Sequence, residues 1–102
     1  MQKPDEVDLS DFRIFETDEF AKQLKKLSSR DAAFLRKKLD SYVYPQIRTE
    51  PFRGNNIKKL QGYSPDTWRY RIGMFRLFYI IDQKKRIIFI LTVDDRKDAY
   101  KK

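Results

Sequence analysis

The spacing of apolar residues changes near residue 56, and this change constrains the fold more than any other feature of the sequence. Before it, apolar residues recur every three or four positions, as they do on one face of a helix. After it, apolar and polar residues alternate or form short β-branched runs, as they do in strands. A chain with helices first and strands second favours an α+β domain.

The first half predicts one strand and two helices. Residues 12–17 alternate like a strand, and residues 18–27 carry an apolar stripe at helical spacing. Ser28, with Asp31 three residues later, fits a capping box that begins a second helix, and Pro45 is expected to end it. The short connection predicts an antiparallel helical hairpin. The buried face of the second helix is predicted to contain Ala32, Leu35, Leu39, Tyr42 and Val43.

The second half predicts a meander of three or four strands. Residues 57–60 form a short first strand, and residues 68–72 and 75–82 form a hairpin around Gly73-Met74, a two-residue loop with glycine first. Residues 87–93 are nearly all apolar, as in a central strand that is covered on both faces.

Together these elements predict a small single domain of 102 residues, because a chain of this length builds one core. An N-terminal strand and the helical hairpin are expected to pack on a mainly antiparallel, twisted sheet of four strands. Residues 1–11 are polar and are expected to form a flexible tail.

The composition excludes several classes of chemistry. The chain has no cysteine and no histidine, which excludes disulfides, thiolate nucleophiles, iron–sulfur clusters and histidine acid/base catalysis. We therefore expect no metal and no cofactor. The N-terminal residues lack the apolar region of a signal peptide, and no apolar run approaches the ~18 residues of a membrane span. We expect a cytoplasmic protein without a membrane partner.

The positive charge is concentrated in the second half. The chain carries 23 Lys and Arg against 15 Asp and Glu, a net charge of +8. Residues 1–50 hold 10 basic and 10 acidic side chains, whereas residues 51–102 hold 13 and 5. Such a one-sided field attracts a nucleic acid backbone or an acidic protein, unless it is only a solvated surface.

The predicted hairpin gathers arginines on one face. If Gly73-Met74 is the loop, Arg71 lies opposite Arg76, with Arg69 two residues away. Like charges directly opposite each other in a sheet cost stability. Because no acid lies within this cluster, we favour binding of phosphate oxygens over a solvated surface without a function.

Other charged residues leave alternatives open. Lys58 and Lys59 either protect a sheet edge or contact RNA. Asp94 and Asp95 are neighbours on an extended chain and should point to opposite faces, which disfavours a metal chelate.

The second half resembles the RelE/ParE superfamily of type II toxins. The resemblance covers about residues 12–100 and is most specific in K-L-x-G at 59–62, W-R-Y-R-I-G-x-[FY]-R-[LV]-x-Y at 68–79 and D-R-K-D-x-Y at 95–100. It implies a RelE-like fold and, in the RelE-like branch, a ribosome-dependent mRNA endonuclease that cuts A-site codons through attack of the 2′-hydroxyl.

The resemblance also implies partners and site residues. The partners would be mRNA in the ribosomal A site and a cognate antitoxin, expected to be acidic. By motif, the catalytic residues would be Arg71, Arg76, Arg96 and Tyr100, and the RNA-binding residues Lys58, Lys59 and Arg69.

Two departures from the motif keep other readings open. Arg69 and Arg71 replace lysines of the nuclease members, and Asp95 replaces a histidine. Arginine stays protonated, so the general base is unassigned among Tyr100, Lys58, Lys59 and Asp95. Catalysis by charge stabilisation and alignment of the 2′-hydroxyl alone also stays open. The alternatives are a ParE-like inhibitor of DNA gyrase and an inactive member that only binds its antitoxin. The four retained motif residues favour the nuclease.

Overall fold

The computed structural model describes residues 11–95, so that residues 1–10 of the expected tail, Arg96 and Tyr100 lie outside the described residues. The helical elements are α2 (Asp18–Lys26), α3 (Ser29–Lys38), the π-helical turn η1 (Leu39–Val43) and α4 (Tyr44–Thr49). The strands are β1 (Arg13–Glu16), β2 (Ile57–Lys59), β3 (Trp68–Ile72), β4 (Phe75–Asp82) and β5 (Ile87–Asp95).

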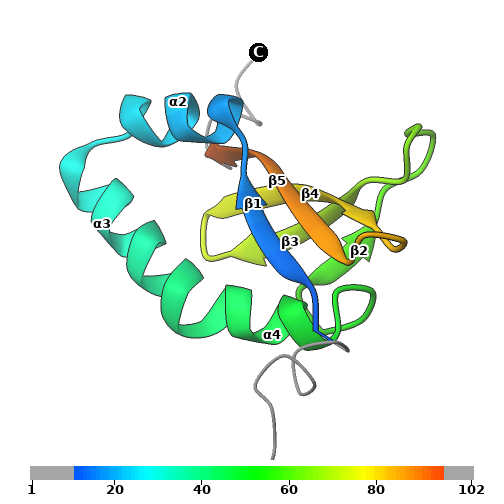
Figure 1. Ribbon diagram of the computed structural model, residues 1–102. Helices are drawn as coiled ribbons and strands as arrows, with labels where there is room; N and C mark the ends of the chain where they lie inside the picture. Colours follow the sequence, from blue (N-terminus) through cyan, green and yellow to red (C-terminus); the bar gives the residue numbers. More distant parts are fainter. Residues whose placement is uncertain (1–10, 96–102) are drawn as a thin grey trace, which may run out of the picture.

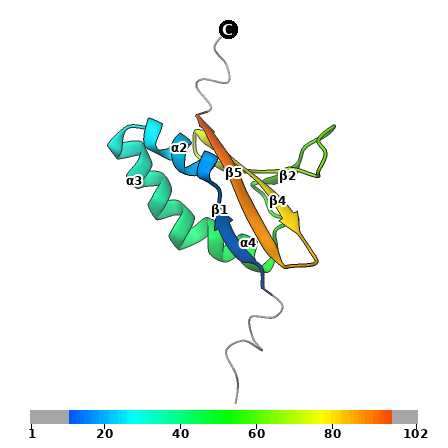
Figure 2. The same cartoon turned by 45° about the horizontal axis from the view of Figure 1, so that its top comes forward.

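The five strands form one mixed sheet in the order β1-β5-β4-β3-β2. The four strands of the second half pair antiparallel, and β1 joins them as a fifth strand, parallel to β5. The helices cover one face of this sheet (Figures 1 and 2). The predicted α+β class and the mainly antiparallel sheet are confirmed.

The predicted helix starts are confirmed by their caps. The Thr17 hydroxyl accepts the backbone N–H of Phe20 at 3.2 Å, and the Ser28 hydroxyl accepts that of Asp31 at 3.1 Å. Each bond satisfies a donor that a helix start leaves unpaired. From residues 27–28 the two helices diverge, because α2 packs on β5 while α3 runs toward α4 (Figure 1). The pair is more open than a closely packed hairpin.

Pro45 does not end the second helix, contrary to the prediction. The chain continues through η1 into α4, where Pro45 lies in the first turn. The N–H of Tyr44 bonds to the carbonyl of Leu39, five residues back, so the helix is wider where the proline ring follows. The wider turn accommodates the proline ring, which in a regular helix would clash with the carbonyl four residues back.

The core lies between the helices and the sheet. Leu35, Leu39 and Val43 bury one face of α3 and η1, as predicted, whereas Tyr42 is 61% exposed. Tyr70, Leu77, Tyr79, Ile88 and Ile90 fill the sheet side.

The sequence predicts that both faces of β5 are covered, but the described residues cover only one of them. Among residues 11–95, the helices lie on one face only (Figure 2). On the other face, Phe89 meets the ring of Phe15 edge to face at 5.6 Å, and Phe15 is 55% exposed. β5 is therefore an interior strand, between β1 and β4, but is not covered on both faces.

Candidate nucleic-acid interface

The β3–β4 hairpin places the arginines as the sequence predicts. Its register pairs Arg71 with Arg76 and Arg69 with Phe78. Gly73 has φ +58°, a conformation that glycine adopts without steric cost, and it supplies the first loop position. Because Tyr70 points into the core, Arg69 and Arg71 point to the opposite face of the strand.

Lys58 extends this cluster across β2. It lies opposite Arg69 in the antiparallel β2–β3 pair, and side chains opposite one another share a face. We call the set formed by Lys58, Arg69, Arg71 and Arg76 the basic face. It brings together four of the seven residues that the sequence assigned to RNA binding or catalysis.

Arg76 retains hydrogen-bonding capacity. Its Nε is shielded from solvent and has no acceptor among the described residues. A buried donor without an acceptor is costly, so an oxygen ligand that reaches this guanidinium would gain a charge-assisted bond. One acid does stand beside the cluster, contrary to the prediction: Asp94 of β5 is the register partner of Arg76.

The remaining candidates lie elsewhere. Lys59 pairs with Trp68, points away from the basic face, and places its Nζ 3.3 Å from Asp66 Oδ2. Asp95 lies opposite Phe75, on the helical side of the sheet. Asp94 and Asp95 thus face opposite sides, as predicted. Arg96 and Tyr100 lie outside the described residues.

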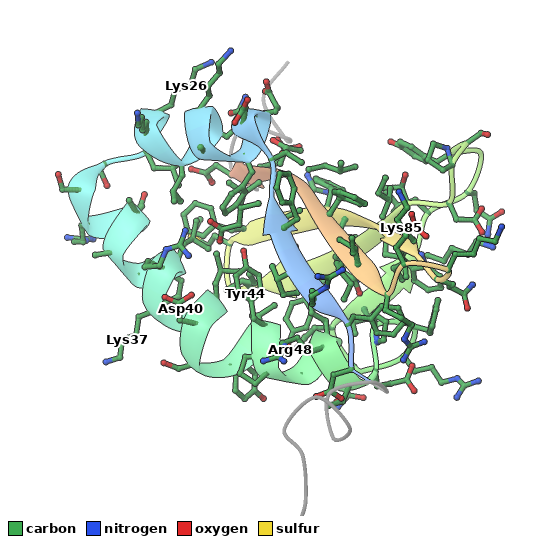
Figure 3. The ribbon with its side chains drawn as sticks, viewed as in Figure 1. Lys26, Lys37, Asp40, Tyr44, Arg48 and Lys85 are labelled. Carbon is green, nitrogen blue, oxygen red and sulfur yellow. The ribbon has the colours of Figure 1, made fainter. Side chains whose placement is uncertain are left out.

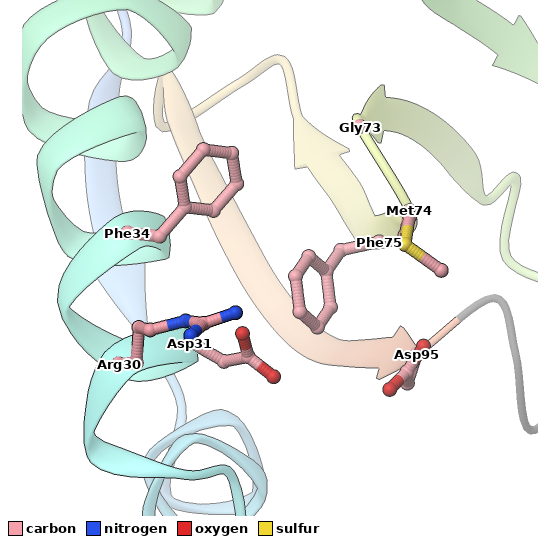
Figure 4. A pocket seen from close by; sticks show the side chains of 7 residues that line it. All are labelled: Arg30, Asp31, Phe34, Gly73, Met74, Phe75 and Asp95. Carbon is pink, nitrogen blue, oxygen red and sulfur yellow. The ribbon is translucent and has the colours of Figure 1, made fainter.

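Two open hollows separate α3 from the hairpin. The first has a volume of about 460 Å³; Phe34 and Phe75 lie across it, and Arg30, Asp31 and Asp95 supply its charged groups (Figure 4). The second, about 330 Å³, has Phe34, Lys38 and Tyr42 on its helical side and Asn56, Tyr70 and Arg71 on its sheet side. We call this second hollow the α3 groove.

The α3 groove was missed by the sequence analysis, although a signal exists. Arg30, Phe34, Lys38 and Tyr42 lie four residues apart, and residues at this spacing share a helix face. Cations and aromatic rings alternate along that line. The predicted burial of Tyr42 concealed the pattern.

A polar network ties β1 to the helices on the covered side of the sheet. The Glu16 carboxylate accepts N–H groups of Arg36 at 2.9 and 3.2 Å and the Tyr44 hydroxyl at 2.7 Å. Figure 3 shows Tyr44 and Arg48 beside β1, and Arg48 Nε donates to the carbonyl of Phe12 at 3.2 Å. These contacts hold β1, the edge strand of the sheet, against the helices.

The network shifts the pKa values of its members. Partial burial raises the pKa of Glu16, but the hydrogen bonds from Arg36 and Tyr44 and the Arg36 charge outweigh it and leave that pKa below its usual value. Burial and the Glu16 carboxylate together raise the pKa of the Tyr44 hydroxyl far above its usual value. Glu16 is thus held in its charged form and Tyr44 in its neutral form, the two forms that make their hydrogen bond, which indicates a structural role.

Neither a cluster of metal ligands nor a membrane-spanning helix occurs in residues 11–95. Nowhere in this part of the chain do three or more Asp or Glu side chains gather as metal ligands. None of its helices combines the length and the apolar character needed to cross a bilayer.

A family comparison decides the class of the protein. The model of the ParE toxin of type II toxin-antitoxin systems, parDE, matches residues 14–100. The chain belongs to the RelE/ParE superfamily of type II toxins. This toxin is 34% identical over 80 residues to the candidate toxin RelE1 of Methanocaldococcus jannaschii, covering 78% of this chain and 84% of that protein.

Solved structures agree with this RelE/ParE assignment. The toxin resembles a chain of the toxin-antitoxin complex RelBE2 from Mycobacterium tuberculosis with a TM-score of 0.66 and 28% identity, covering 84% of this chain and 99% of that one. A free mutant of the Escherichia coli RelE toxin shares the fold, with a TM-score of 0.62, 23% identity and 87% coverage of both chains. The predicted family and fold are confirmed.

Proposed function

We propose that this RelE/ParE toxin is a ribosome-dependent mRNA endonuclease that cleaves A-site codons. The observation that carries the proposal is the cross-strand pair Arg71 and Arg76, continued by Arg69 and Lys58 on the same face. Folding gains nothing from placing two arginines opposite each other, because like charges repel there. A bound phosphate would relieve that repulsion.

The proposed reaction is an internal transesterification. The 2′-oxygen attacks the adjacent phosphorus, the P–O5′ bond breaks, and the products are a 2′,3′-cyclic phosphate and a 5′-hydroxyl. Arg71 and Arg76 would bind the non-bridging oxygens, whose charge grows in the transition state. By motif, Arg96 would add a further donor to the phosphate.

Proton transfer needs a separate group, because guanidinium does not release its proton at neutral pH. Of the four candidates, Lys59 and Asp95 point away from the basic face. Lys58 on that face and Tyr100, placed by motif, are left to take the 2′-proton and to protonate the leaving 5′-oxygen. We leave Lys59 out of the proposed RNA-binding set because its ammonium group pairs with Asp66.

The proposed partner in the resting cell is an antitoxin. The RelBE2 and Pyrococcus horikoshii relatives were solved as complexes of toxin and antitoxin. An acidic antitoxin segment would suit a chain with a net charge of +8 and could mask the basic face. A protein that acts on translating ribosomes would work in the cytoplasm.

A second candidate function is inhibition of DNA gyrase. One observation favours it: the matching family model is that of the ParE toxins. Both functions use the same fold, so the fold alone does not choose between them.

The test is to induce the protein in cells and to map new 5′ ends of mRNA within minutes. We expect cuts at codon positions of translated frames, reduced about 100-fold or more by Arg71→Ala or Arg76→Ala, as for the loss of one transition-state donor. Lys85→Ala is the matched control, because Lys85 is exposed in the turn beyond the far end of β4. Intact mRNA together with inhibited DNA supercoiling would overturn the nuclease and support the gyrase inhibitor.

A further inference from the structure

We propose that the α3 groove binds one nucleotide of single-stranded RNA next to the cleaved phosphate, with its base on Tyr42 and its phosphate between Lys38 and Arg71. The inference rests on the proposed nuclease function. It extends the RNA site from the sheet to a helix that carries none of the toxin motif residues.

The charge of the groove selects an anion. Two cations, Lys38 and Arg71, line it, and its lining contains no carboxylate. The neighbouring hollow differs, since Asp31 and Asp95 line it. A negative ligand is therefore favoured in the α3 groove and repelled by the acids of its neighbour.

The aromatic residues of the groove suit a base. Tyr42 is 61% exposed and Phe34 is 41% exposed, so both rings offer surface to a ligand. The Phe34 ring is already engaged, with Lys38 Nζ 5.9 Å from its centroid and the Phe75 ring at 6.3 Å. Tyr42 remains as the stacking surface. Cations beside an exposed aromatic ring are the pattern by which proteins bind single strands.

The π-helical turn explains why Tyr42 is available. Val43 and Tyr44 are both buried although they are adjacent, because η1 adds a residue to the helical turn. Tyr42 is thereby left on the outer surface, whereas Leu39 before it and Val43 after it remain in the core.

Arg71 connects the groove to the basic face. It lies opposite Arg76 in the sheet and also lines the groove. Its backbone N–H donates to the carbonyl of Asn56 at 2.9 Å, which fixes the β3 edge against the loop that completes the groove. A strand whose phosphate lies at Arg76 would enter the groove by passing over the edge of β3 at Arg71, where the pairing with β2 has ended.

Binding is tested with the full-length protein and a short single-stranded RNA whose 2′-hydroxyls are methylated, so that no cleavage occurs. Dissociation constants are measured by fluorescence anisotropy at low salt. We expect Tyr42→Leu to weaken binding about tenfold, since a stacked base contributes on that order, and Tyr42→Phe to leave it unchanged. Lys38→Met should weaken binding, whereas the control Lys37→Met, at an exposed position outside the groove lining, should not.

The outcomes separate this inference from the proposed function. If Arg76→Ala weakens binding but Tyr42→Leu and Lys38→Met remain within twofold of the parent, the groove inference is wrong and the basic face stands. If the parent protein does not bind the RNA, the groove inference is also wrong. The proposed nuclease function is then tested independently by the mapping of 5′ ends. If Tyr42→Leu weakens only the complex with the antitoxin, the groove is a protein-docking site instead.

Discussion

Arg76 of β4 and Asp94 of β5 are register partners on the basic face. A β-bulge between Phe78 and Tyr79 produces this pairing. Counted back from the turn after Asp82, a regular ladder would put Val93 opposite Arg76. The bulge instead keeps Val93 in the core opposite Leu77 and brings a carboxylate beside the arginine.

We expect Asp94→Asn to strengthen RNA binding two- to fivefold, because it removes the negative charge of the residue that pairs with Arg76 in the sheet. The same change should lower the free energy of unfolding by about 0.2–1 kcal/mol, the usual value of an opposite-charge pair across two strands. Anisotropy with the methylated RNA and urea denaturation measure the two effects. Asp66→Asn is the control, since Asp66 pairs with Lys59 away from the basic face. Unchanged RNA affinity in Asp94→Asn would contradict this assignment.

The Gly73 loop position sets the arginine register. Gly73→Ala forces an L-residue to φ +58°, which should cost about 1–2 kcal/mol of unfolding free energy. An added Cβ would only touch the Phe34 ring, 3.8 Å away, so the backbone dominates the cost. Met74→Ala, at the exposed second loop position, should change stability little in the same urea titration. Equal midpoints for the two variants would refute the argument.

The polar network around Glu16 should contribute measurably to stability. Tyr44→Phe removes the hydroxyl that donates to Glu16 Oε2 at 2.7 Å. Because the acceptor is charged but partly exposed, we expect a loss of about 1–2 kcal/mol in urea denaturation. Tyr42→Phe is the matched control, since Tyr42 is exposed. A loss of the same size in both variants would show that the Glu16 bond is not the cause.

The same network predicts an acid-sensitive fold. Folding lowers the pKa of Glu16 from its usual 4.5, because hydrogen bonds and the Arg36 charge outweigh the effect of burial. The stabilisation is therefore complete above about pH 4.5 and is lost as the pH falls through the lower pKa of the folded state. The difference in unfolding free energy between the parent and Glu16→Gln should shrink from pH 7 to pH 3. A constant difference would contradict the linkage.

Tyr79 anchors the loop after α4 to the sheet. Its hydroxyl donates to the carbonyl of Pro51 at 2.6 Å in the buried core. Tyr79→Phe leaves that carbonyl without its donor and should cost about 1–3 kcal/mol. Tyr63→Phe, at an exposed position, should cost nothing in the same thermal and urea melts.

Alkali should also weaken the Tyr79 anchor. Burial raises the pKa of Tyr79 in the fold above its usual 10.0, so its stabilisation is present below pH 10 and declines as the pH rises further. The difference in unfolding free energy between the parent and Tyr79→Phe should therefore become smaller above pH 10.

The hairpin could be predicted from the sequence because its constraints are local. A two-residue loop with glycine first fixes the register, and the alternation around Tyr70 fixes the faces. These two features placed Arg71 opposite Arg76 without knowledge of the rest of the fold. The pairing of β1 with β5 joins distant segments, and nothing in the alternation of either strand specifies a parallel neighbour.

Two features escaped prediction because each departs from regular periodicity. The bulge at Phe78 and Tyr79 shifts Asp94 into place, and no glycine or proline marks it. The η1 turn carries the helix through Pro45 and turns Tyr42 outward. Arguments from a constant period of 2 or 3.6 residues fail wherever one extra residue is inserted.

The π-helical turn also determines how this chain tolerates changes in length. Upstream of it, Leu35 and Leu39 face the core, and downstream of it Tyr44 and Ile47 do so in a phase offset by one residue. Deletion of Ser41 would restore an ordinary helix and would leave Leu39 and Tyr44 four residues apart, so both would still face the core. Tyr44 would then still face Glu16, because the residue removed is the one that η1 adds. One residue can therefore be removed from residues 39–43 without turning either end of the helix, whereas a second deletion there would rotate one end by about 100° relative to the other.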